Sequence, residues 1–145
     1  MASACYNIFT KKCIDGGFAG VTADIRVLFL KSTYTFDPDH QFVADLTPGT
    51  HELSVAGYAR QALATQTTTQ DNINNRSEAD SDDPDFGALT SGQTIASAVY
   101  FVQVTNDADS WLIGFVDTGG FPLPTNGGNV KIQHNAEGWL NALRL

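Results

Sequence analysis

Basic residues are scarce in this sequence. Lysine and arginine together number eight against sixteen aspartates and glutamates, which gives a formal net charge of −8. Proteins that bind DNA or RNA bring clusters of lysine and arginine to the phosphate backbone. The sequence therefore predicts no nucleic-acid partner. A net negative charge of this size is typical of a protein that remains soluble because of its charge.

The sequence also has few cysteines and no long apolar run. The two cysteines, Cys5 and Cys13, fall within one predicted helix. They would stand roughly 12 Å apart along its axis, which is too far for a disulfide. We expect two reduced thiols that act as small packing side chains. No apolar run approaches the ~18 residues that cross a bilayer and no secretory signal pattern is seen, so we expect synthesis in the cytoplasm and no membrane partner.

Motifs of catalytic sites are missing as well. The three histidines, His40, His51 and His134, are the ordinary candidates for a base at neutral pH, and none lies in a recognised motif. Ser32, His40 and Asp45 could be drawn as a triad, but proximity in sequence does not supply the required geometry. No glycine-rich loop continues with the lysine and hydroxyl of a phosphate site. We predict that the protein is not an enzyme, with no catalytic residue and no cofactor.

Two groups of side chains could bind a metal ion by their chemistry. The first is His40 with Asp37 and Asp39, although aspartates around Pro38 are typical of a turn in which carboxylates accept nearby amides. The second is the polar stretch 71–85, which lacks the glycine and glutamate spacing of an EF-hand calcium loop. We favour a turn for the first, a solvated loop or hairpin tip for the second, and no metal site. The carboxylates of the stretch are Asp71, Glu78, Asp80, Asp82, Asp83 and Asp85.

Apolar strand patterns are the strongest positive signal. Residues 24–30 place apolar side chains on both faces of a strand, which indicates the interior of a sheet, and Asp37–Asp39 then forms a rigid corner. Ile95–Val104 and Trp111–Asp117 are predicted to form an antiparallel pair in the core. At 145 residues the chain is long enough for one domain, residues 1–145, with a single core.

Weaker patterns complete the prediction. Apolar spacing predicts a helix over Ser3–Ile14, whose apolar stripe needs a sheet or another subunit to cover it, with Leu28 and Leu30 as plausible neighbours. Together, six or seven strands without alternating helices predict an all-β fold, an antiparallel β-sandwich with a short N-terminal helix. The remaining segments are a helical turn at Gln41–Leu46, a loop at Thr50–Ala59 and strands at Tyr58–Gln70, Asn129–Asn135 and Gly138–Leu145.

The exposure of the two tryptophans bears on whether the protein could bind sugars. Exposed indole rings on a β-sandwich can stack on sugars, whereas Trp111 and Trp139 each lie in an apolar strand segment. We therefore expect both to be buried.

Several motifs together resemble a family of small virion proteins of tailed bacteriophages. Its members share a strand followed by S-x-Y-x-x-D-x-D-x-x-F, then G-Y, an L-I-G-Y-V-D-like strand and a terminal strand. The corresponding residues here are Ser32, Tyr34, Asp37, Asp39, Phe42, Gly57, Tyr58, Leu112–Asp117 and Asn135–Leu145. The resemblance covers nearly the whole chain. The sequence departs from the pattern in the alanine, glutamine and threonine after Tyr58 and in the acidic stretch 71–85.

The resemblance implies a β-sandwich on the virion surface, in the manner of a capsid decoration or cement protein that binds the major capsid protein of the assembled shell. It also implies self-association, with a trimer as the expected oligomer and the apolar stripe of the N-terminal helix as the first candidate contact. Two alternatives stay open: a structural component of the neck or tail, and a surface module that binds host glycans.

Overall fold

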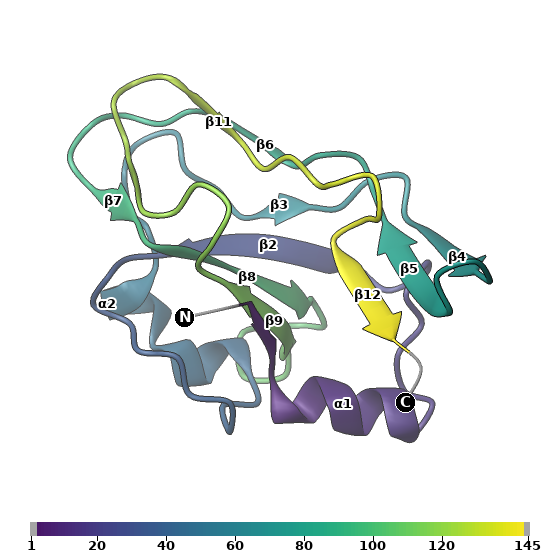
Figure 1. Ribbon diagram of the computed structural model, residues 1–145. Coiled ribbons are helices and arrows are strands. Elements are labelled where there is room, and N and C mark those ends of the chain that lie inside the picture. Colours follow the sequence, from purple (N-terminus) through teal and green to yellow (C-terminus); the bar gives the residue numbers. More distant parts are fainter. Residues whose placement is uncertain (1–2, 144–145) are drawn as a thin grey trace.

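A five-stranded antiparallel sheet runs through the middle of the molecule, in a computed structural model that describes residues 3–143 (Figure 1). Its strand order is β1-β9-β8-β2-β3. The strands are β1 (Ala4–Cys5), β2 (Ile25–Leu30), β3 (Gln61–Ala62), β8 (Ser97–Val102) and β9 (Trp111–Val116).

Three smaller antiparallel sheets and three short helices surround this central sheet. One sheet has three strands in the order β12-β5-β4, and the others are the pairs β10-β7 and β11-β6. Their strands are β4 (Thr67–Asp71), β5 (Arg76–Asp80), β6 (Asp85–Ala88), β7 (Thr94–Ile95), β10 (Leu123–Pro124), β11 (Asn129–Lys131) and β12 (Leu140–Leu143). The helices are α1 (Asn7–Ile14), the 3-10 helix η1 (Val43–Leu46) and α2 (Pro48–His51).

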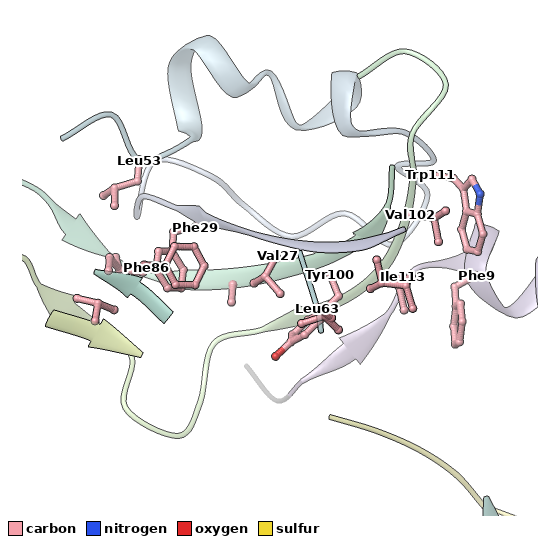
Figure 2. Packing of buried hydrophobic residues seen from close by; sticks show 14 of the residues in the cluster. Phe9, Val27, Phe29, Leu53, Leu63, Phe86, Tyr100, Val102, Trp111 and Ile113 are labelled. Carbon is pink, nitrogen blue, oxygen red and sulfur yellow. The ribbon is translucent and has the colours of Figure 1, made fainter. Parts of the chain in front are cut away.

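The central strands β2 and β8 are buried on both faces, as the double apolar pattern of residues 24–30 predicts. Successive side chains of a strand point to opposite faces, so these strands separate two apolar clusters. Phe29 belongs to the larger cluster, where its ring lies 4.0 Å from that of Phe86, centroid to centroid (Figure 2). Leu28 and Leu30 belong to the second, which Val43 and Leu46 of η1 complete. The sheet is thus covered on both sides.

The predicted all-β class with a short N-terminal helix is confirmed, and the strands are spread over four sheets within the described residues. The predicted antiparallel pairing of residues 95–104 with 111–117 is present as β8 and β9. The helical turn at 41–46 is present as η1, and the terminal strand as β12. Residues 144–145 of that last prediction lie outside the described residues.

The bounds of four predicted segments were wrong. The helix begins at Asn7 instead of Ser3, because Ala4 and Cys5 pair with Phe115 and Gly114 of β9. The strand predicted over 58–70 is divided into β3 and β4, because the chain turns between them at Thr65 (φ 53°). The first residues of the loop predicted over 50–59 belong to α2, which ends at His51. The strand predicted over 129–135 is present only as β11, which ends at residue 131.

The cysteines also differ from expectation. Both thiols are free, as predicted, but both residues are exposed instead of packed in the core. For Cys5 the reason is the later start of the helix, which leaves this residue on the edge strand β1. Helix α1 instead packs Phe9, which is buried with its ring 5.1 Å from that of Phe18. This part of the apolar stripe is covered by the chain itself and is not free for another subunit.

Candidate functional site

The corner after β2 is tied to the start of α1. The Asp37 carboxylate accepts the backbone N–H of Asp39 at 3.0 Å, as the predicted turn requires. The Asp39 carboxylate accepts the side-chain amide of Asn7 at 2.7 Å, and the Asn7 N–H donates to the Pro38 carbonyl at 3.0 Å. Asp37 therefore caps a backbone amide as expected, whereas Asp39 holds a side chain of α1.

Beneath this corner, hydroxyl groups join Tyr6, Tyr34 and His40. The Tyr34 hydroxyl lies 3.2 Å from that of Tyr6 and 3.1 Å from His40 Nδ1. The other ring nitrogen of His40 is 3.8 Å from the Asp37 carboxylate. Burial raises the pKa of Tyr6 and of Tyr34, so both phenols are protonated at neutral pH. The arrangement holds the corner on the sheet.

The drawn triad of Ser32, His40 and Asp45 is not assembled by these contacts. His40 bonds to Tyr34, while the Asp45 carboxylate accepts the backbone N–H groups of Gln41 and Phe42 at 2.8 and 2.9 Å and so caps η1. Within residues 3–143, no group of three or more histidine, cysteine, aspartate or glutamate side chains is placed to hold a metal ion.

The acidic stretch 71–85 forms a hairpin and its exit. Asp71 accepts the backbone N–H groups of Ile73 and Asn74 in the turn between β4 and β5. Of the two alternatives for the stretch, a hairpin tip is present here, but strand β5 follows within the stretch instead of a loop. Asp83 accepts the backbone N–H of His134, and this bond lowers the pKa of the Asp83 carboxyl. The backbone N–H of Gly87 does the same for Asp85. These carboxylates fix the chain locally.

Arg60 forms an ion-pair network that no pattern in the sequence predicts. Its guanidinium donates to both carboxylate oxygens of Glu52, at 2.8 and 2.7 Å, and to both of Asp107, at 2.6 and 2.9 Å. Glu52 also accepts the Tyr58 hydroxyl at 2.8 Å, and that hydroxyl in turn accepts the Phe29 N–H at 3.0 Å. Hydrogen bonds to Glu52 raise the pKa of Arg60, and those from Arg60 lower the pKa of Asp107. Distant segments are thus joined to β2.

Nothing in the spacing of these residues signals the network, because Asp107 lies 47 positions from Arg60. Of the four residues in the network, only Tyr58 belongs to the virion-protein pattern, as half of its Gly-Tyr pair.

A hollow of about 580 Å³ lies beside β8, with a lining that includes Phe29, Tyr100 and Trp139. The Tyr100 hydroxyl is 3.0 Å from His134 Nε2, and the Trp139 indole stacks on the Tyr100 ring with centroids 5.1 Å apart. Trp111 is buried, 7% exposed, as predicted. Trp139 is only half-buried, but its neighbour already covers one ring face.

Comparisons of the chain with protein-family models, with curated proteins and with solved structures gave no match. None of the helices in residues 3–143 has the length and apolar character needed to span a membrane.

Proposed function

We propose that the chain is a non-enzymatic structural protein of a tailed-bacteriophage virion, a capsid decoration or cement protein that binds the assembled shell of major capsid protein. One observation supports this most directly. The residues that carry the resemblance to phage virion proteins form or hold together elements of the fold. This is expected of a sequence pattern whose role is structural.

Several residues of that pattern make structural contacts. Tyr34 and Asp37 hold the corner, and Phe42 forms a bridge with Trp111 of the central sheet. The Tyr58 hydroxyl binds the backbone of β2. The L-I-G-F-V-D segment, residues 112–117, supplies most of β9.

Charge supports the proposal in a second way, because an adhesive protein has to stay soluble until it meets the shell. Carboxylates outnumber cationic side chains sixteen to eight, and the resulting net charge of −8 favours solubility. The ion pairs between them include Lys11–Asp15, Arg26–Asp24, Arg60–Glu52, Arg76–Glu78 and Lys131–Asp83.

Cryo-electron microscopy of the parent particle tests the proposal. We expect density for this fold in many copies over the shell faces. Density confined to the unique tail axis would support the neck or tail alternative instead. A binding assay adds an independent test: purified protein should co-sediment with empty shells and leave unassembled capsid subunits in the supernatant. Absence from the particle would contradict both virion roles.

Self-association belongs to the proposal, with a trimer as the expected oligomer. Light scattering should give a mass near three times the 15.6 kDa of one chain. A single-chain mass at all concentrations would contradict this part.

The glycan-binding alternative gains little from the tryptophans. Trp111 is buried, and Trp139 offers at most one ring face beside Tyr100. A half-buried ring with one face already covered is a small platform for stacking a sugar. We therefore retain the shell-binding proposal.

A further inference from the structure

Strand β4 leaves one side of its backbone open. It is the outer strand of the sheet β12-β5-β4 and pairs with β5 alone, in a continuous register from Thr67↔Asp80 to Asp71↔Arg76. In Figure 1 it lies at the far right of the molecule, away from the central sheet. The outward N–H and C=O groups of an edge strand can bind a further strand.

The devices that usually protect an edge are missing from β4. Natural edge strands are kept short, bulged or interrupted by proline or lysine. The edges of the central sheet, β1 and β3, are each two residues long, whereas β4 has five residues and its pairing with β5 has no shift in register. Residues 61–70 carry no charge and no proline. β4 is therefore competent to pair with another strand.

The sequence of β4 suits pairing with itself. Antiparallel pairing centred on Thr69 sets Thr69 opposite Thr69, Thr68 opposite Gln70 and Thr67 opposite Asp71. Cross-strand threonine pairs are favourable, and no like charges meet in this register. Each copy carries a net charge of −8, and the absence of charge from Thr67 to Gln70 limits the repulsion between two copies that meet at this strand.

Exposed apolar side chains stand at both ends of β4. Ile73, at the hairpin tip, is 90% exposed. Val21 is 48% exposed and lies in the loop beside the start of β4, where the Gln66 amide donates to the Ala23 carbonyl at 3.0 Å. Antiparallel pairing brings the tip of one hairpin to the start of the other. Ile73 of each copy would then lie close to Val21 of its neighbour.

We infer that a second copy of this chain binds along β4, with the two strands antiparallel across a two-fold axis and three strands from each copy forming one continuous sheet. This inference is independent of the proposed function. The contact is small, so association is weak, with a Kd of roughly 10 µM to 1 mM. A two-fold contact also doubles the mass of any trimer present.

Sedimentation velocity over this concentration range, with Thr69→Asp, Thr69→Lys and their mixture beside the wild type, tests the inference. Wild type should double in mass with concentration. Each variant alone places like charges opposite each other and should raise the Kd about fivefold or more, whereas the mixture pairs opposite charges and should restore association. Thr50→Asp, an exposed position in α2 on the opposite side of the molecule in Figure 1, is the matched control and should behave as wild type.

Hydrogen exchange of the wild-type protein provides an arm that needs no variant. Amides of residues 67–71 that do not bond to β5 should exchange more slowly as concentration rises. A mass that does not double up to roughly 1 mM would overturn the inference. So would Thr69→Asp protein that associates like wild type, a mixture that does not recover, or an equal loss in Thr50→Asp.

Discussion

The hydroxyl of Tyr58 shows how much one polar atom contributes to this fold. Phe29 is fully buried in β2, and its N–H donates to Tyr58 instead of to a neighbouring strand. The same hydroxyl donates to Glu52 and so connects the strand to the Arg60 network. A buried N–H without a partner costs free energy, so a hydroxyl 29 positions away completes the hydrogen bonding of β2.

Tyr58→Phe should therefore lower the free energy of unfolding by about 1–3 kcal/mol, since it leaves the Phe29 N–H unpaired. Urea denaturation followed by fluorescence measures the change. Thr118→Val, which removes an exposed hydroxyl bonded to Ser3, is the control and should change stability by less than about 0.5 kcal/mol. Equal effects of the two substitutions would contradict the role of Tyr58.

Gly57, the other half of the Gly-Tyr pair, has a steric reason to be glycine. Its φ is +89°, and a Cβ at this position would lie 2.4 Å from the Ala88 carbonyl oxygen. Gly57→Ala should cost at least about 1–2 kcal/mol for the left-handed conformation alone, with the clash adding to it. Gly49→Ala is the control, because nothing lies within 4 Å there, and it should be neutral or slightly stabilising. Chemical denaturation compares them.

Strands and turns differ in how far the sequence predicts them. β2, β8 and β9 are apolar on both faces over six residues each, and this pattern was sufficient to predict both their burial and the pairing of β8 with β9. β1 could not be predicted, because two residues carry no period and their partner is β9, more than a hundred positions away. The break before β4 depends on a positive φ at Thr65, a residue type that gives no signal of such a turn.

Substitution of Asp37 and Asp39 tests whether their hydrogen bonds, and not a bound cation, stabilise the turn after β2. The double substitution Asp37→Ala, Asp39→Ala removes a backbone cap and the bond to Asn7, which should cost about 0.5–2 kcal/mol and lower the Tm by a few degrees. Thermal denaturation should give the same decrease with and without chelator. If chelator alone lowered the Tm of the unaltered protein equally, a bound cation would explain the corner instead.

At the scale of the whole molecule, the Arg60 network connects three segments that lie apart in the sequence. Glu52 directly follows α2, and Arg60 directly precedes β3. Asp107 lies between β8 and β9. The guanidinium also lies 5.5 Å from the centroid of the Phe101 ring. Such a network depends on the tertiary fold, and this explains why local patterns predicted the central strands but not the polar contacts between loops.

Acid should weaken this connection. Arg60 lowers the pKa of Asp107 in the folded protein, so the stabilisation is complete above the ordinary aspartate pKa of about 3.9 and is lost as the pH falls through the lower, folded value. Asp107→Asn should cost about 1 kcal/mol or less near pH 7, because Asp107 is partly exposed, and the difference from wild type should vanish in strong acid. Urea midpoints across pH measure it. A difference that is constant with pH would contradict this assignment.

The pairing of β1 with β9 has a consequence for synthesis on the ribosome. Ala4 pairs with Phe115, so the residues of β1 have no strand to join until β9 has been translated. Until then Tyr6 and Phe9, which are buried in the finished protein, are exposed to solvent. The segment from Ala4 to Phe9 thus reaches its final place only after β9 has been made, and its apolar side chains are open to contact with other molecules until then.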